Sequence, residues 1–351
     1  MRVLILTASY WSWHNAAAFA LEKCYQRKGW QTKVVDLTDF ANKIFVKLTQ
    51  KSYKIMSEDI PILWEKFFNL TDKVFLAKLI YSLKDPLWQA KFDELVSNFN
   101  PDIVISVYPF WNLVVKGYKK KYKNSFRYGI VITDAINIQS FWYIDDDIVD
   151  RYFVIDDLTK EIVVEKFKVS PDKVVVSFFP ILPEFFVDKR HIDKKKIMIL
   201  LTALKKDFVF SLLEYFKDKE IEVKIVKWRN DKLYEKVKHK LGDVEKFAFY
   251  DFLDIKKELK NIWIMIAKAG WALTSECIAT DTPMIVPYYI WGQEEGNVKL
   301  IYNYGLGFSD NDINRVKFIY EYLDWNKLLW NFKKVKKKDS CEIVYDSLLS
   351  N

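Results

Sequence analysis

Short runs of apolar and β-branched residues recur along the chain, and most are separated by stretches with the periodicity of amphipathic helices. The first series of expected strands lies at Val3–Thr7, Lys33–Leu37, Ile103–Val107, Tyr128–Thr133, Tyr152–Ile155 and Val174–Phe178. The second series lies at Ile197–Leu201, Glu222–Val226, Lys246–Tyr250, Trp263–Ala267 and Pro283–Pro287. The first helix is expected to begin at about Asn15 and to end near Gly29. This order predicts an α/β fold whose strands form parallel sheets with helices on both faces.

The two series of strands are divided by a stretch with two prolines and a charged run, at residues 180–195. Such a stretch is typical of an interdomain linker, and a chain of 351 residues is long enough for two hydrophobic cores. We therefore expect a Rossmann-like domain over residues 1–185 with a mainly helical insertion at 40–100, a second such domain over 190–324, and a helical tail over 325–351 that packs back across the junction.

The composition is that of a folded protein in a reducing compartment. Hydrophobic residues make up 50% of the chain, which is enough to fill both cores and excludes a disordered protein. The apolar runs are shorter than a membrane span, and no signal peptide is recognisable. Because Cys24, Cys277 and Cys341 form no CxxC pair, we expect a cytoplasmic protein without structural zinc.

The charge of the chain suggests an anionic partner. A net charge of +8 is compatible with binding to nucleic acid or to an anionic membrane surface, and basic residues cluster at residues 116–127 and 333–338. Lysines also alternate with Phe, Trp and Tyr in the insertion, a pattern typical of helices that lie in the headgroup layer, although amphipathic core helices share it. No nucleic-acid-binding module is recognisable, so the expected partner is a membrane surface. The alternative is that the two basic clusters are ordinary solvent-exposed faces that bind no partner.

The sequence YWSWHN, residues 10–15, follows the first strand, where nucleotide-binding domains usually have a glycine-rich loop. Here Trp11 and Trp13 replace small residues, so the loop is either a disabled phosphate loop or one that binds another ligand on flat aromatic faces. His14 is then a candidate general base, or a packing residue. Asp134, at the end of a buried strand, is a second candidate base or a group that orients His14, and its alternative role is to cap the next turn.

The segment AKAGWALTSECIATDTPMIVPYYIWGQEEGN, residues 267–297, contains a second candidate site. A strand ends at Ala267, the chain turns at Gly270, and a helix follows, whose start suits a diphosphate. Glu276 lies about one turn into this helix, where its carboxylate can accept hydrogen bonds from a ribose diol. Residues 292–297 bring together amide and carboxylate groups suited to sugar hydroxyls. The alternative is a polar turn that Gly caps.

This segment resembles the donor site of the monogalactosyldiacylglycerol synthase and processive diacylglycerol glucosyltransferase family, which has a K-A/P-G…E…P…GQE…N pattern here. The matching residues are Lys268, Gly270, Glu276, Pro283, Gly292, Gln293, Glu294 and Asn297. The segments VLILTASYWSWHNAAAFAL, PDIVISVYPF, GIVITD and FFPILPEF resemble the family's N-terminal half in the same order, so that the resemblance runs from about residue 3 to residue 308.

The resemblance implies a GT-B fold, with two facing Rossmann-like domains and a cleft between them. It implies an inverting glycosyltransferase that moves a hexose from a UDP-sugar to a diacylglycerol-type membrane lipid, at the cytoplasmic face of the membrane and without a cofactor or catalytic metal. The donor would be bound by Lys268, Gly270, Glu276, Gln293, Glu294 and Asn297. Trp11 and Trp13 would contact the acceptor, and His14 and Asp134 would be catalytic. The acidic run at residues 145–147 follows an aromatic turn and is interpreted as a solvated loop, not a metal site.

The chain also departs from the family. The family's first loop is Gly-Gly-Gly-His, whereas this chain has Trp11, Ser12 and Trp13 before His14. A Gly-rich loop is likewise absent after Leu201, where the sequence reads TALKKD. Two other functions are therefore considered: a non-catalytic relative that binds nucleotide or lipid, and, less in keeping with the sequence, a nucleic-acid-binding protein with a steep salt dependence.

Overall fold

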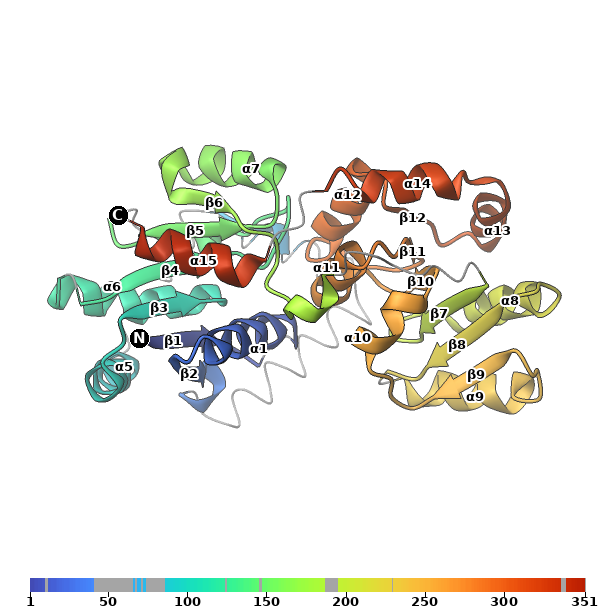
Figure 1. Cartoon of the computed structure of the whole chain (residues 1–351), viewed down its shortest axis with the longest axis horizontal. Helices are drawn as coiled ribbons and strands as arrows, with labels where there is room; N and C mark the ends of the chain where they lie inside the picture. The colour runs from blue at the N-terminus through green and yellow to red at the C-terminus, as the bar shows by residue number, and fades with distance from the viewer. Residues whose placement is uncertain are drawn as a thin grey trace. The chain divides into compact units, whose positions relative to one another are not determined.

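The computed structural model describes most of the chain outside the insertion (Figure 1). The described residues are 1–9, 12–40, 66, 68–70, 72–73, 86–123, 125–144, 147–186, 195–228, 230–335 and 339–350. They form two compact units. The first unit comprises Met1–Pro183, Trp291–Gly296 and Lys338–Asn351, and the second comprises Glu184–Ile290 and Asn297–Lys337. Most of the predicted insertion at 40–100 lies outside the described residues, and its longest described element is the helix α5 (Pro86–Phe99).

The first unit is built on a sheet of six strands in the order β2-β1-β3-β4-β5-β6. The strands are β1 (Arg2–Thr7), β2 (Gln31–Asp36), β3 (Ile103–Ser106), β4 (Arg127–Val131), β5 (Arg151–Val154) and β6 (Val174–Val176). All neighbouring pairs are parallel, with Val3 beside Ile103 and Thr32, for example. The first series of predicted strands is therefore confirmed, with boundaries that differ by a few residues.

Helices cover both faces of this sheet. The helices of the unit are α1 (Ser12–Arg27), α5, α6 (Asn112–Lys121), α7 (Asp157–Phe167) and α15 (Ser340–Leu349). Successive strand residues point to opposite faces, and one set, which includes Leu4, Val104 and Tyr128, shares a core with α5, α6 and α7. On the other face Leu348 of α15 packs closely on Gly129, and α15 also contacts α1.

The second unit has its own parallel sheet, in the order β12-β11-β10-β7-β8-β9. The strands are β7 (Lys196–Leu200), β8 (Glu222–Val226), β9 (Phe247–Tyr250), β10 (Ile264–Ile266), β11 (Met284–Val286) and β12 (Gly307–Ser309). The helices are α8 (Lys206–Lys217), α9 (Asp231–Leu241), α10 (Ile255–Glu258), α11 (Trp271–Ala279), α12 (Glu295–Asn303), α13 (Ile313–Tyr322) and α14 (Trp325–Phe332). Sequence patterns predicted five of these strands and missed β12, because its three residues, Gly-Phe-Ser, form no apolar run.

Short 3-10 turns complete both units. They are η1 (Leu37–Asp39), η3 (Pro109–Trp111), η4 (Ser140–Trp142), η5 (Pro171–Lys173), η6 (Pro183–Phe185) and η7 (Leu259–Asn261). The tail contains two helices that belong to different units: α14 lies in the second unit, and α15 returns to the first unit (Figure 1).

Each sheet has a point where the order of its strands reverses. In the first sheet β1 is followed along the chain by β2 on one side, and the described chain then continues at β3 on the other. In the second sheet the same change occurs between β7 and β10. Open parallel sheets bind ligands at the carboxyl ends of their strands at such points. These two places are therefore where candidate sites are sought.

Candidate active site

His14 lies at the switch point of the first sheet. Because α1 begins at Ser12, His14 is in the first turn of the helix, and the sequence-based placement of this residue on a loop was wrong. The physical reason is packing, since in the helix His14 is buried and its ring lies edge-on to that of Tyr108, at 5.0 Å between centroids. The side chain of Asn15 fixes this turn to the end of β1, where the Thr7 hydroxyl donates to Asn15 Oδ1 at 2.8 Å.

The His14 ring is enclosed by residues from three neighbouring segments. Its Nδ1 lies 3.1 Å from the hydroxyl of Thr133, just beyond β4, and the ring also hydrogen-bonds to the backbone of Val107 at the end of β3. Tyr108 packs edge-on at 5.0 Å between ring centroids, and Trp142 lies at 6.1 Å. Only 2% of the His14 surface is exposed.

This enclosure determines the charge of His14. Burial lowers the pKa of His14 to about 3, although the hydrogen bond to Val107 opposes the shift. The ring is therefore neutral at physiological pH. The Thr133 hydroxyl can donate or accept, so it suits either neutral tautomer.

Asp134 follows Thr133 and retains part of its surface exposed. Its Oδ2 accepts a hydrogen bond of 2.5 Å from the indole N–H of Trp142. Burial raises the pKa of Asp134 to about 6, the Trp142 hydrogen bond lowers it in part, and the nearby Asp72 carboxylate raises it further. Trp142 thus contacts both candidate catalytic groups, because its ring also packs near His14.

An ion pair supports the segment that carries Trp142. Asp72 accepts hydrogen bonds from the backbone N–H and the hydroxyl of Ser140, at 2.7 and 2.8 Å. Lys166 of α7 pairs with the same carboxylate at 2.6 Å. These contacts anchor η4 at its first residue, Ser140, and so hold Trp142 against Asp134.

The structure describes one of the two tryptophans predicted to contact an acceptor. Trp13 is half-buried beside His14, whereas Trp11 lies outside the described residues. A tryptophan next to the candidate base provides a flat apolar face for a ligand. Contact of Trp13 with an acceptor stays a prediction.

In the second unit, two of the predicted donor residues, Lys268 and Gly270, lie directly before α11, which follows β10. Gly270 is the N-cap of α11, and its carbonyl accepts from the N–H of Thr274 at 2.9 Å, while Lys268 lies two residues earlier. The first-turn N–H groups of a helix at the carboxyl edge of a parallel sheet suit an anionic ligand. The edge is that of β10, which lies beside β7 at the switch point of this sheet.

Glu276 lies on α11 and is half-buried. Burial raises the pKa of Glu276 to about 8, which leaves the carboxyl group largely protonated at neutral pH. A ligand that donates hydrogen bonds to this group would favour its ionised form and lower this pKa.

Asn297 supports the loop before α11. Its side chain is fully buried, and its amide donates to the carbonyl of Ala269 at 2.7 Å. Within the described residues, the hydroxyls of Thr274 and Ser275 and the side-chain oxygen of Asn297 are buried and have no hydrogen-bond partner. Such atoms are rare in folded proteins, so their occurrence on α11 and at Asn297 is consistent with a site that a polar ligand completes.

Gln293 and Glu294, by contrast, belong to the first unit, in the segment Trp291–Gly296. Both are buried, and the side-chain amide of Asn137 donates to the Gly292 carbonyl at 2.5 Å. The described structure therefore divides the six predicted donor residues between the two units. Lys268, Gly270, Glu276 and Asn297 lie in the second unit.

Sequence reasoning did not identify Thr133, Trp142 and Asp72 as parts of the site. Thr133 stands in the GIVITD segment directly before Asp134, and this adjacency was a usable signal. Trp142 and Asp72 gave none, because their contacts with Asp134 and Ser140 arise only from the folding of loops.

Comparison with known proteins finds similar sequences over most of the chain. The family model described as monogalactosyldiacylglycerol (MGDG) synthase matches residues 14–181. The processive diacylglycerol β-glucosyltransferase of Bacillus pumilus is 27% identical over 379 residues, which cover 99% of this chain and 94% of that protein. The enzyme of the same name from Bacillus subtilis is 25% identical, with the same coverage. The resemblance predicted from the motifs is confirmed.

Solved structures of similar fold include MurG of Acinetobacter baumannii, with a TM-score of 0.62, 12% identity and 99% coverage of both chains. UDP-GlcNAc 2-epimerase of Neisseria meningitidis, bound to UDP-GlcNAc, has a TM-score of 0.59, 12% identity and full coverage of both chains. The predicted GT-B class of α/β fold, with two Rossmann-like units, is confirmed. Among the residues that the structure describes, no helix combines the length and the apolar character needed to cross a membrane.

Proposed function

We propose, from the confirmed resemblance to the monogalactosyldiacylglycerol synthase and processive diacylglycerol glucosyltransferase family, that this protein is an inverting glycosyltransferase. It moves a hexose from a UDP-sugar to a diacylglycerol-type lipid. It acts as a peripheral protein at the cytoplasmic face of the membrane. The names of relatives that match 99% of the chain support the acceptor and the reaction type.

In this proposal the second unit binds the donor. The diphosphate lies at the start of α11, where Lys268 and the N-terminal N–H groups offset its charge. Glu276 accepts hydrogen bonds from the ribose, and Asn297 holds the preceding loop through Ala269. As UDP leaves, these groups stabilise the growing negative charge, so the proposal requires neither a cofactor nor a catalytic metal. By the resemblance alone, we propose that Gln293 and Glu294 contact the hexose.

The first unit supplies the base. The acceptor hydroxyl attacks the anomeric carbon, its proton passes to the base, and the bond to the diphosphate breaks on the opposite side, which inverts the anomeric centre. Asp134 fits this role better than His14, because an effective base has a pKa near the working pH, and the pKa of Asp134 is about 6 whereas that of His14 is about 3. The neutral His14 ring then positions Thr133, and Trp13 provides a face for the lipid's glycerol.

One observation carries the proposal. At the carboxyl edge of the first sheet, Asp134 is partly exposed and has a raised pKa, and the residue before it, Thr133, contacts the buried neutral His14. The test is to incubate purified protein with UDP-glucose or UDP-galactose and a membrane lipid extract, and to identify new glycolipids by mass spectrometry. A lipid that gains one hexose supports the proposal. Binding of UDP by calorimetry without any glycolipid product would instead identify a non-catalytic relative.

A further inference from the structure

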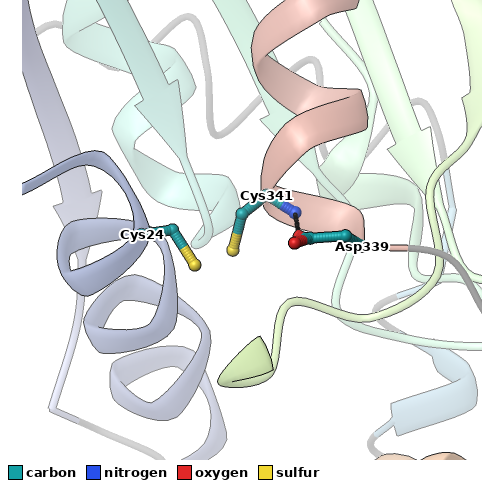
Figure 2. Close-up of side chains that lie close together, drawn as sticks. All are labelled: Cys24, Asp339 and Cys341. Carbon is teal, nitrogen blue, oxygen red and sulfur yellow. Dashed lines mark hydrogen bonds between the residues drawn. The ribbon is translucent and has the colours of Figure 1, made fainter. Parts of the chain in front are cut away.

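Two cysteines that are distant in sequence meet in the first unit. Figure 2 shows the side chains of Cys24, on α1, and Cys341, at the start of α15, pointing toward one another. The two sulfur atoms and a carboxylate oxygen of Asp339 all lie within 4.8 Å of one another. Only 6% of Cys24 and 2% of Cys341 is exposed.

The contacts of α15 hold Cys341 in this place. The hydroxyl of Ser340 donates to the Phe179 carbonyl at 3.2 Å, and that of Tyr25, next to Cys24 on α1, donates to the Cys341 carbonyl at 3.3 Å. The Cys341 sulfur also lies 3.8 Å from the carbonyl of Ala20. The fold therefore keeps the two thiols adjacent although the whole second unit separates them along the chain.

Helix capping accounts for the position of Asp339. Its Oδ1 accepts hydrogen bonds from the backbone N–H groups of Cys341 and Glu342, at 3.0 and 3.3 Å, so it is the N-cap of α15 (Figure 2). Among the residues that the structure describes, the cluster offers three ligand groups, and structural zinc sites use four. The geometry thus favours chemistry between the two sulfurs over a metal site.

We propose that Cys24 and Cys341 form a disulfide under oxidising conditions, and that this bond fastens α15 to α1. With a low-molecular-weight disulfide such as oxidised glutathione, the thiolate of one cysteine attacks the glutathione disulfide and releases one reduced glutathione. The thiolate of the other cysteine then attacks the protein sulfur of the mixed disulfide and releases the second. Two protein thiols and one oxidised glutathione become one protein disulfide and two reduced glutathiones.

The docked pair is protected from rapid exchange. The hydrogen bond with Cys24 and burial raise the pKa of the Cys341 thiol, and little thiolate is present while α15 is docked. Exchange therefore proceeds when α15 lifts from α1, and docking then decides the equilibrium by keeping the partner thiol close. By thermodynamic linkage, the disulfide must raise the equilibrium constant for docking of α15 by the same factor by which docking raises the equilibrium constant for disulfide formation.

The test uses the full-length protein, equilibrated in glutathione buffers from reducing to oxidising, alkylated and analysed by intact mass and peptide mapping. The expected result is a species that lacks two hydrogens, in which the peptides with Cys24 and Cys341 are joined. Half of the folded protein should be oxidised at a ratio of oxidised to reduced glutathione at least tenfold lower than the ratio that the same cysteine pair needs in urea. The oxidised protein should also unfold at a higher temperature than the reduced one.

The third cysteine, Cys277, is buried in α11 of the second unit and provides a matched control. Cys277→Ser should keep the redox-dependent shift in unfolding temperature, whereas Cys24→Ser or Cys24→Ala should abolish it. Mixed glutathione adducts without the internal bond, or a folded-state midpoint equal to that in urea, would overturn the proposal in the wild-type protein itself. Stoichiometric zinc that is retained by the wild type and lost in Cys24→Ser would assign a metal site instead.

Discussion

The hydroxyl of Thr133 lies 3.1 Å from Nδ1 of His14 and joins the loop after β4 to the first turn of α1. Both side chains are buried, so the hydrogen bond has little competition from water. It connects two segments at the carboxyl edge of one sheet, and Asp134 follows directly. The geometry of the candidate base therefore depends on this contact.

Replacement of Thr133 by valine keeps the shape of the side chain and removes the hydroxyl. We expect Thr133→Val to lower the free energy of unfolding by about 1–3 kcal/mol, because a buried ring nitrogen of His14 loses this hydrogen bond. Urea unfolding measures this effect. Thr133→Ser retains a hydroxyl and should be closer to the wild type, and equal stability of Thr133→Val and the wild type would show that the contact is dispensable.

The proposed role of Asp134 predicts how activity depends on pH. A base acts only when it is deprotonated, so transfer should be lost as pH falls through the pKa of about 6 and should level off above it. Asp134→Asn, which can still accept from Trp142, should lower turnover about 10²–10⁴-fold and remove this dependence. Initial rates over the acidic to neutral range provide the measurement. A profile that stays flat through pH 6 in the wild type would argue against Asp134 as the base, and would suit His14, with its pKa of about 3.

Glu276 predicts a second pH dependence, in binding. Because its pKa is about 8 in the unliganded protein and the ribose favours the ionised form, UDP affinity should rise with pH and level off above 8. Above that pH, Glu276→Ala should weaken binding by about 1.5–3 kcal/mol, and the loss should shrink as pH falls. Calorimetry with UDP measures both effects. Glu276→Gln separates the titration of the protein from that of UDP, and an identical pH dependence in this variant would exclude Glu276 from the site.

The parallel sheets could be predicted because buried strands such as β3, Ile103–Ser106, are short apolar or β-branched runs. The strand β8, Glu222–Val226, instead places Val223 and Ile225 inward between partly exposed charged residues, and its boundaries were predicted correctly. The start of α1 was missed because the helix is extended by contacts of His14 with residues more than ninety positions away, such as Tyr108 and Thr133. A local pattern carries no signal for such contacts.

The same limit applies to the candidate donor site. The motif predicted that Gln293 and Glu294 belong to the same donor site as Lys268. The segment that contains Gln293 and Glu294 packs on Ala135 and Asn137 of the first unit. The reason is steric: Gly296 approaches the Ala135 carbonyl so closely that only a glycine fits, and this contact belongs to the tertiary structure.

This close approach gives a further prediction. A Cβ at Gly296 would lie 1.9 Å from the backbone oxygen of Ala135, so Gly296→Ala should destabilise the protein by about 1–3 kcal/mol or displace the segment. Gly117→Ala is the matched control, because there the Cβ meets the flexible end of Gln89, at 2.0 Å. Thermal unfolding of the two variants compares them. Equal melting temperatures would refute the predicted packing of Gly296.

The basic surface of α6 predicts membrane binding that depends on salt. Lys120, in the last turn of α6, and Lys123, two residues beyond the helix, are exposed, and each lysine contributes about 1 kcal/mol near an anionic surface. The protein should co-sediment with anionic vesicles at low salt and be partly released as salt increases. Lys120→Gln with Lys123→Gln should weaken this binding more than the same loss of charge at Lys232 and Lys236 of α9. Equal recovery on neutral and anionic vesicles would contradict an electrostatic anchor.

The central claim is that the chain catalyses inverting transfer of a hexose to a diacylglycerol-type lipid. Its most direct test is to incubate the wild type and Asp134→Asn with UDP-glucose or UDP-galactose and diacylglycerol in anionic vesicles, and to determine the anomeric configuration of the product by NMR. The account predicts a hexosyl-diacylglycerol of the configuration opposite to that of the donor, formed by the wild type and almost absent with Asp134→Asn. A product with retained configuration, or no glycolipid from a wild type that binds UDP, would contradict it.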